Sequence, residues 1–389
     1  MDFQLTEQQK LIQETARRIA REKVAPRAAE IDEKEEYPED IYQAFKEVGL
    51  LGLSIPQEYG GSGAGVLALA LAVEEVAKYC CSSGLILLLS MLSTQPIIIG
   101  GTEEQKKRWA GAVARGEMRA SFCLTEPSTG SDAANLRTRA VRDGDDYVLN
   151  GEKSYISGGT VADFVTLFAK TDPTAGSRGI TGFIIDAKNT PGFSVARTDR
   201  KMGVKAVATA HFAIQDARVP AENVIGGSEG RGFNAAMLGL NTCRPVVGAR
   251  GLGLAEGALA YALEYARKRE AFGSPIADLQ AIQFMLADMA IAIEASRLLV
   301  YQAAWNVDHG LYQREHAHYL SIAKAFATET AVKVSSDAIQ ILGAQGYMMD
   351  HPLERHYRDA RQLMIVEGTS QIQRVLISRA LLDRNLVYA

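Results

Sequence analysis

The chain has 389 residues, of which 47% are apolar and 23% charged. This balance is typical of soluble globular proteins and excludes disordered and fibrous classes, and the length predicts two or three domains. The 42 Lys and Arg residues against 46 Asp and Glu residues give a net charge of −4. Because no basic excess is available to hold a phosphate backbone, nucleic-acid binding is disfavoured.

The cysteines and the apolar runs indicate the compartment. The four cysteines form no C-x-x-C pair, which favours free thiols in a reducing environment. The first residues lack the basic-then-apolar profile of a secretory signal. The longest apolar runs, such as 84–89 and 96–99, are too short to span a bilayer. These features predict a cytoplasmic protein with no membrane partner.

The first third of the chain has a helical pattern. From residue 4 to about 116, apolar side chains recur at spacings of three and four. Thr6 with Gln9, and Thr102 with Gln105, have the spacing of helix N-caps and their capping boxes. The pattern predicts an N-terminal helical domain over residues 1–120.

The sequence pattern in the middle of the chain predicts β-strands. From about 117 to 225, β-branched and aromatic residues come in short runs such as 164–168 and 180–185. Turn signals such as Asn150-Gly151 separate the runs, at a spacing typical of an antiparallel barrel or sandwich. The pattern predicts an antiparallel β-barrel domain over residues 121–230.

The remainder of the chain is rich in Ala and Leu and is helical again. The stretches 281–305 and 317–341 are each long enough for six or seven turns. A bundle of long helices is therefore predicted over residues 231–389. The order helical, β, helical predicts a mostly α fold with a central β domain and excludes a parallel βαβ sheet.

Two patterns in the sequence lack the surroundings that their chemistry needs. Residues 226–230 match the nucleophile-elbow pattern G-x-S-x-G, but no alternating βα pattern surrounds Ser228, so a loop is the preferred interpretation. None of the six histidines has a partner at the spacing that places two ligands on one helical face. They are predicted to be surface or interface residues, and no metal is assigned.

Four segments carry a specific signal, and together they resemble the acyl-CoA dehydrogenase family over essentially the entire chain. They are Cys123-Leu124-Thr125-Glu126-Pro127-Ser128-Thr129-Gly130-Ser131-Asp132, Asn150-Gly151-Glu152-Lys153-Ser154-Tyr155-Ile156-Ser157-Gly158-Gly159, Arg269-Glu270-Ala271-Phe272-Gly273 with Gln280, and the run from Tyr357-Arg358-Asp359-Ala360 to Ile365-Val366-Glu367-Gly368-Thr369-Ser370-Gln371-Ile372-Gln373-Arg374. The run Arg244-Pro245-Val246-Val247 is most similar to the short- and medium-chain branch.

The resemblance implies a fold and a reaction. The fold is an N-terminal helical domain, a β domain and a C-terminal four-helix bundle, assembled as a homotetramer with FAD at a subunit interface. The reaction is the FAD-dependent dehydrogenation of an acyl-CoA to the trans-2-enoyl-CoA, as in β-oxidation of fatty acids. A carboxylate removes the α-proton, the β-hydrogen leaves as hydride to flavin N5, and the electrons pass to an electron-transferring flavoprotein.

The resemblance makes Glu367 the catalytic base. Its neighbours Ile365 and Val366 are expected to hold the carboxylate in an apolar pocket, which raises its pKa toward the value that the proton abstraction needs. Because Gly368 has no side chain, it is expected to leave room for the thioester of the substrate. Some family members carry the base immediately before the Arg that is here Arg244, and because that position is Cys243, the assignment favours Glu367.

The family's binding residues carry over by position. Those expected to bind substrate are Ser131, Asn241, Arg244 and Gly368. Those expected to bind FAD are Phe122, Cys123, Leu124, Thr125, Gly130, Ser131, Tyr155, Ile156, Ser157, Arg269, Phe272, Gln280, Gln340, Ile341, Leu342, Gly343, Ala344, Thr369 and Gln371. Among these, Arg269, Phe272, Gln280 and 340–344 correspond to contacts made to the FAD of a neighbouring subunit.

Four positions depart from the medium-chain branch. Tyr155 replaces Trp, Ser157 replaces Thr and Ala344 replaces a second Gly. The aromatic face and the hydroxyl survive at the first two, so flavin binding is expected to persist. Asn241 replaces an acid that contacts CoA in that branch.

Two alternatives remain open at this point. The first is a relative that retains FAD but acts as a desulfinase or an oxidase, and the second is a silent acyl-CoA-binding protein. Against the desulfinase, no Lys, Arg or His lies between Lys78 and Lys106, so an anionic acyl end would lack a partner in the segment expected to line the acyl pocket. The leucines between 85 and 92 favour an apolar acyl group.

Overall fold

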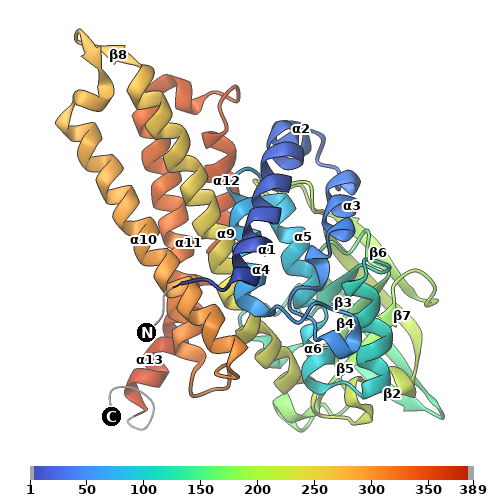
Figure 1. The fold of residues 1–389 in the computed structure, drawn as a ribbon. Helices are drawn as coiled ribbons and strands as arrows, with labels where there is room; N and C mark the ends of the chain where they lie inside the picture. Colours follow the sequence, from blue (N-terminus) through green and yellow to red (C-terminus); the bar gives the residue numbers. More distant parts are fainter. Residues whose placement is uncertain (1–3, 384–389) are drawn as a thin grey trace.

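The computed structural model describes residues 4–383 and has a helical N-terminal part, a β domain and a C-terminal helical bundle. The β domain and the far end of the bundle lie on opposite sides of the molecule, with the N-terminal helices packed between them (Figure 1). The predicted order of helical, β and helical segments is confirmed. The outer limits of the predicted domains, 1–3 and 384–389, lie outside the described residues.

The N-terminal helices begin where the sequence predicts. Thr6 and Thr102 cap α1 and α7, and each forms a complete capping box with the Gln three residues later. Helices α4 and α5 are buried along almost their whole length, as their lack of a polar face dictates. The helices of this part are α1 Glu7–Ile19, α2 Ala28–Lys34, α3 Glu39–Glu47, α4 Gly65–Ala77, α5 Cys81–Leu92, α6 Gln95–Gly100, α7 Glu103–Gln105 and α8 Gly111–Ala114.

The β domain is one curled seven-stranded sheet. Its strands are β1 Ala120–Cys123, β2 Arg139–Asp143, β3 Asp146–Ser157, β4 Phe164–Lys170, β5 Ile180–Asp186, β6 Phe193–Thr198 and β7 Thr209–Pro220. Their order is β1-β4-β2-β3-β7-β6, and β5 pairs with β4. Most pairs are antiparallel as predicted, but β1 and β2 each pair with β4 in parallel.

Two irregularities interrupt the pairing of β3 with β7. They lie between Leu149 and Gly151 and between Lys153 and Ile156. The second irregularity contains Tyr155, which has a left-handed backbone with φ of 60°. A bulge of this kind turns a side chain out of the regular alternation of a strand. It therefore re-aims Tyr155 relative to its neighbours in β3.

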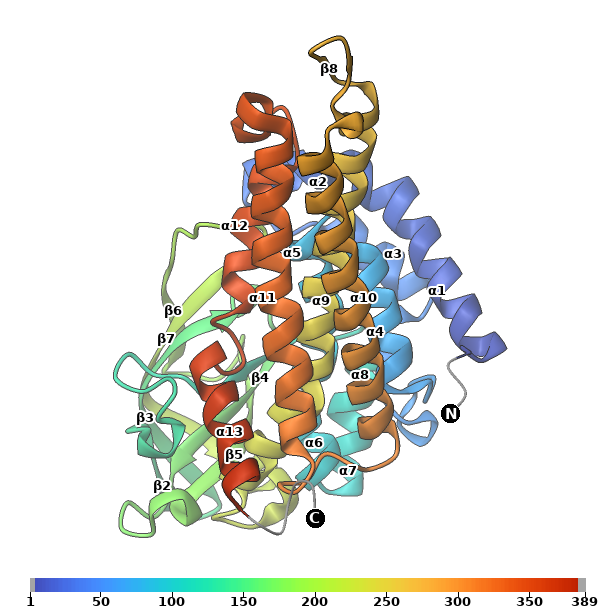
Figure 2. The same ribbon diagram turned by 90° about the vertical axis from the view of Figure 1, so that its left-hand side faces the viewer.

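The C-terminal bundle is built from long helices. They are α9 Gly232–Lys268, α10 Gln280–Asp308, α11 Ala317–Leu342, α12 Leu353–Leu363 and α13 Ser370–Leu382, with the short hairpin strands β8 Glu270–Ala271 and β9 Ser274–Pro275 joining α9 to α10. Helices α10 and α11 run side by side on the outer side of the bundle (Figure 2). The predicted helices at 281–305 and 317–341 are confirmed to within three residues at either end.

Helix α9 approaches α4 closely through glycines. A Cβ at Gly253 would lie 2.1 Å from the Glu74 carbonyl oxygen, and a Cβ at Gly257 would lie 2.1 Å from that of Lys78. Only glycine permits this contact between the two backbones. Helix α9 thus joins the N-terminal helices to the bundle and carries several of the site residues described below.

Two stretches are long and apolar enough to cross a membrane, at 81–100 and within α9. The expectation that the apolar runs are too short was therefore wrong on length, because the few polar residues within these stretches leave their mean hydropathy high. In each stretch, most of the apolar window is buried inside the fold, 83% and 67% respectively. This burial is typical of helices that form the core of a globular protein.

Candidate active site

Glu367 lies in the loop between α12 and α13, in a constrained backbone. Its φ is 55° and that of Gly368 is 96°, so two successive residues are left-handed. A non-glycine residue in this region costs on the order of 1 kcal/mol and persists where the surroundings impose it. The Lys324 Nζ and Gln373 Nε2 atoms impose it here, since they donate to the Gly368 carbonyl at 2.9 and 2.8 Å.

The Glu367 carboxylate is enclosed and unsatisfied. Its Oε2 atom is buried and has no hydrogen-bond partner among the described residues. Burial raises the pKa of Glu367 to about 7, against the opposing charges of Arg250, Lys324 and Arg244. Burial also lowers the pKa of Lys324 to about 8, with the Glu367 charge acting in the other direction. A carboxylate with this pKa is suited to accept a proton near neutral pH.

The wall around Glu367 differs from the predicted one. Ile365 is 53% exposed and therefore does not shield the carboxylate, because the turn before Glu367 directs its side chain outward. Val366 packs against the main core. Cys243 of α9 is fully buried near the base, and both burial and the Glu367 charge raise the pKa of its thiol. The position where some relatives carry the base is thus close to Glu367 in space.

Arg244 and Asn241 form one unit on α9. The Arg244 Nη1 atom donates to the Asn241 Oδ1 atom at 2.5 Å, and the Asn241 Nδ2 atom donates to the Tyr312 carbonyl at 3.0 Å. Arg244 is buried, which lowers the pKa of its guanidinium to about 10, and its Nε atom has no partner among the described residues. Asn241 therefore orients Arg244 beside the base.

The structure brings together the first two predicted FAD-binding segments. The Ser154 backbone N–H donates to the Thr125 carbonyl at 2.9 Å, and the Ser121 hydroxyl donates to the Ser157 carbonyl at 2.9 Å. Cys123 and Ile156 are buried in the β domain, so their side chains are unavailable to a ligand and only their backbones remain for contact. Tyr155 is 62% exposed on this surface.

A buried ion pair between Lys153 and Glu126 holds these two segments together. The sequence patterns did not reveal it. The Lys153 Nζ atom donates to the Leu124 carbonyl at 3.0 Å and to the Glu126 carboxylate at 2.9 Å. Thr138 donates to the same carboxylate through its backbone N–H and its hydroxyl. Burial alone would raise the pKa of Glu126, but the Lys153 charge and these hydrogen bonds lower it overall. The pair fixes the Leu124 backbone.

A second group of hydrogen-bonded polar side chains lies next to the Tyr155 ring. His211 contacts the Ser154 hydroxyl at 2.9 Å and the Asp199 carboxylate at 2.5 Å, and its ring packs edge-on against that of Tyr155. The prediction that the histidines are surface or interface residues is wrong for His211, and also for His318 and His356, which are buried. Long-range packing, which no local spacing reveals, accounts for their burial.

The second group of predicted FAD contacts lies at the far end of the bundle. The hairpin at 270–275 and the C-terminal end of α11 lie together at that end, away from the β domain (Figure 1). Phe272 at the hairpin tip is 96% exposed, and Arg269, Gln280, Gln340, Gly343 and Ala344 are exposed as well. Ile341 and Leu342 pack inside the bundle, which leaves only their backbones for a ligand.

The remaining predicted residues lie in two places. Gly130 and Ser131 are exposed after a turn in which Glu126 and Thr129 exchange backbone hydrogen bonds. Thr369 caps α13 by accepting from the Ile372 N–H, and Gln371 is exposed in the first turn of that helix. Ser228 of the rejected nucleophile pattern is exposed in the loop that precedes α9.

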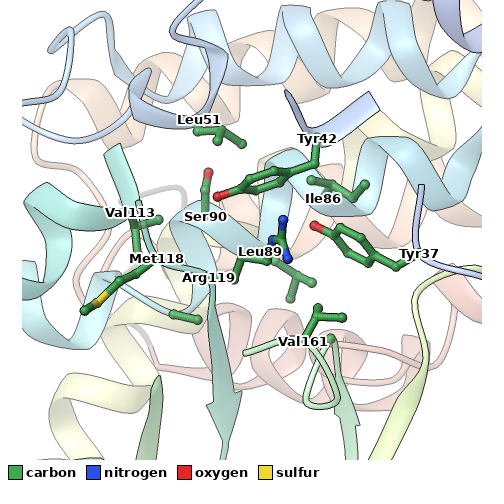
Figure 3. Close-up of a pocket in the computed structure, with 12 residues that line it drawn as sticks. Tyr37, Tyr42, Leu51, Ile86, Leu89, Ser90, Val113, Met118, Arg119 and Val161 are labelled. Carbon is green, nitrogen blue, oxygen red and sulfur yellow. The ribbon is translucent and has the colours of Figure 1, made fainter. Parts of the chain in front are cut away.

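A small cavity lies apart from all these residues. Its volume is about 30 Å³, and it lies between α5 and the start of β1 (Figure 3). The Arg119 guanidinium sits over the Tyr42 and Tyr37 rings at 4.1 and 5.2 Å, beside Leu89. None of the predicted site residues lines it. A space that holds about one water molecule is too small for an acyl group.

Comparison with known proteins identifies the family. Family models described as the N-terminal, middle and C-terminal domains of acyl-CoA dehydrogenase match residues 6–117, 121–217 and 230–382. Cyclohex-1-ene-1-carbonyl-CoA dehydrogenase of Geobacter metallireducens is 44% identical over 97% of this chain and 99% of its own length.

Solved structures agree as well. Butyryl-CoA dehydrogenase of Megasphaera elsdenii is 40% identical, with a TM-score of 0.94 over 98% of this chain and all of its own. A chain from a structure reported for the electron transferring flavoprotein of Acidaminococcus fermentans is 43% identical, with a TM-score of 0.95 over 98% of this chain and all of its own. The chain therefore belongs to the acyl-CoA dehydrogenase family of flavoproteins, oxidoreductases that act on CH–CH bonds.

Proposed function

We propose that this enzyme catalyses the FAD-dependent dehydrogenation of an acyl-CoA thioester to the trans-2-enoyl-CoA, with Glu367 as the base that removes the α-proton. The observation that carries the proposal is the state of the Glu367 carboxylate. It combines a buried, unpartnered oxygen, a pKa raised to about 7 and a left-handed backbone held by Lys324. Such strain and such a pKa are features of functional sites.

The residues present fit a flavin. Tyr155 offers an exposed aromatic face beside Ser157, and the Thr129 hydroxyl is buried without a partner among the described residues, next to Gly130 and Ser131. An orphaned hydroxyl in this turn is suited to the polar parts of FAD. Arg269 and the backbone amides of 343–344 would hold the pyrophosphate or adenosine end, because a guanidinium matches phosphate oxygens. When bound, FAD supplies the acceptor for the β-hydrogen.

A homotetramer is part of the proposal. Large apolar side chains recur at every seventh position along α10 and are exposed: Phe284 by 61%, Ile291 by 68%, Leu298 by 57% and Trp305 by 48%. A spacing of seven residues places all four on one helical face. A continuous exposed apolar stripe marks a protein contact. The protein that covers this stripe is a second copy of this chain. Such an assembly would bring the hairpin at 270–275 to the FAD of a neighbouring subunit.

We further propose that electrons pass to an electron-transferring flavoprotein in the cytoplasm. The likeness to the chain from the Acidaminococcus fermentans structure supports such a partner. The four cysteines are buried and free, which is consistent with a reducing compartment. β-Oxidation of an acyl group is the process in which this reaction would serve.

An anaerobic flavin spectrum tests the proposed function. Purified protein is titrated in separate cuvettes with butyryl-CoA, octanoyl-CoA, isobutyryl-CoA and cyclohexanecarbonyl-CoA. Bleaching of the main flavin band with a long-wavelength charge-transfer band is expected for a substrate. Protein without flavin would contradict the cofactor assignment, and bound flavin that no acyl-CoA reduces would contradict the dehydrogenation.

A further inference from the structure

Arg250 is a fully buried cation with unsatisfied donors. It lies on α9 and has no exposed surface. Its Nη2 atom donates to the Cys81 carbonyl at 3.3 Å and to the Cys81 sulfur and Gln362 Oε1 at 3.4 Å each, and the two contacts to oxygen are long. Its Nε and Nη1 atoms have no partner among the described residues. The guanidinium therefore lies between the first turn of α5 and the last turn of α12 with most of its donors unused.

This arrangement is energetically costly. A charge that is buried without a counter-ion loses most of the solvation that water gives it. Other arginines near the same helices avoid the cost: Arg358 pairs with Asp32 and Glu354. Arg250 forms no salt bridge with any residue that the structure describes between 4 and 383. The fold itself therefore does not account for the positive charge at this point.

Arg250 lies near the base. Among the charges that lower the pKa of Glu367, that of Arg250 is the largest, ahead of Lys324 and Arg244. Both the Glu367 Oε2 atom and the Arg250 Nη1 atom are enclosed and lack partners among the described residues. Helix α5, which carries the leucines expected to line the acyl pocket, starts at Cys81 beside Arg250. Gln362, which Arg250 also contacts, lies shortly before Glu367 in the sequence. An acyl group that is bound at Glu367 and runs along α5 would extend toward this guanidinium.

We propose that Arg250 binds a carboxylate at the far end of the acyl group, so that the substrate is a short ω-carboxyacyl-CoA. The inference rests on the proposed function, because it assigns the substrate class of that same site. A carboxylate would take up the free Nε and Nη1 donors as a charge-assisted pair. A methyl end would leave them desolvated and unpaired. The acyl chain of this substrate would be short, because Arg250 lies near the base.

The lack of a cation between Lys78 and Lys106 does not exclude a partner for an anionic acyl end. The absence of cations between Lys78 and Lys106 suggested that an anionic acyl end would lack a partner near the acyl pocket. Arg250 is 169 residues from Cys81 in sequence, yet it contacts the start of the pocket helix. The cation comes from α9, and the segment from 78 to 106 by itself did not reveal it.

Matched thioesters test the inference on the holoenzyme. We would measure dissociation constants by calorimetry for glutaryl-CoA against pentanoyl-CoA and for adipyl-CoA against hexanoyl-CoA, pairs that differ only in a carboxylate for a methyl. The same pairs are measured with Arg250→Met, which removes the charge at similar length, and with Arg250→Lys, which keeps it. Flavin content and thermal melting report whether each variant folds.

The expected result is that one carboxylate thioester binds about tenfold or more tightly than its methyl partner, as a charged hydrogen bond in a buried site implies. The preference is lost in Arg250→Met and partly kept in Arg250→Lys. Equal binding, or a preference for the methyl partner, in the unaltered enzyme overturns the inference even if no variant folds. A preference that persists in Arg250→Met also overturns it.

The two proposals fail in different ways. Flavin reduction by pentanoyl-CoA without a carboxylate preference would leave the dehydrogenase proposal standing and remove the role of Arg250. Bound thioesters that never reduce the flavin would contradict the dehydrogenase proposal, whereas the ratio of dissociation constants would still decide the role of Arg250.

Discussion

The Lys324 ammonium donates a 2.9 Å hydrogen bond to the main-chain carbonyl of Gly368, the residue that follows the base. Lys324 is fully buried in α11, and Gly368 lies 44 residues away in the loop before α13. The same cation lowers the pKa of the Glu367 carboxylate, which burial raises. One side chain therefore holds the backbone of the base loop and adjusts the charge state of the base.

The first prediction concerns the base itself. Glu367→Gln keeps the size of the side chain but removes the proton acceptor, so turnover should fall by at least about 10³-fold. Flavin content and acyl-CoA binding should be retained. Stopped-flow measurement of flavin reduction at saturating substrate checks this. Near-normal reduction would exclude Glu367 as the base.

The second prediction concerns pH. Glu367 must be ionised to accept a proton, so kcat/KM should rise with pH and level off above a pKa of about 7. In Lys324→Met a cation that lowers this pKa is lost, so the rising limb should move to higher pH. Steady-state kinetics across roughly pH 5.5 to 9, a range that spans this pKa, would measure the shift of the limb. A limb that moves to lower pH would contradict the electrostatic role of Lys324.

The third prediction concerns the ion pair under the flavin segment. Lys153→Met leaves the Glu126 carboxylate buried without its cation and should lower the free energy of unfolding by about 3–5 kcal/mol. The double variant Glu126→Gln with Lys153→Met removes both charges and should be less destabilised than Lys153→Met alone. Chemical denaturation followed by circular dichroism measures both. A double variant that is the less stable of the two would argue against charge burial as the cause.

The fourth prediction concerns the hairpin tip. Phe272 is 96% exposed in one chain, so its removal should not affect the folding of that chain. If the hairpin contacts the FAD of a neighbour, Phe272→Ser should raise the dissociation constant for FAD about tenfold or more. Flavin retention after dialysis measures this. Leu11→Ser, at another exposed apolar position (68%) on α1, serves as the control and should retain its flavin.

The fifth prediction concerns assembly. Leu298→Glu places a charge in the middle of the exposed stripe on α10 and should dissociate the proposed homotetramer into smaller species, because a buried unpaired charge is costly. Light scattering coupled to size-exclusion chromatography measures the mass. Val141→Glu, at a residue of β2 that is 64% exposed, is the matched control and should leave the mass unchanged. An unchanged mass for Leu298→Glu would exclude the stripe as an interface.

The sequence by itself determined the elements and their order. Capping boxes at Thr6 and Thr102, the strand runs at 164–168 and 180–185, and the long helices of the bundle all appear where they were predicted. These features depend on hydrogen bonds and periodicity within a few residues, which can be read from the local sequence. The four motif segments also pointed to the family that the comparisons establish.

Only the tertiary structure decided which side chains meet. The exposure of Ile365, the burial of His211 and the pairing of Lys153 with Glu126 depend on contacts between separate elements. The clearest case is Arg250, which reaches Cys81 across 169 residues and Gln362 across 112. Such a contact is set by how whole helices pack, because burial removes a charge from water only after distant segments have closed around it.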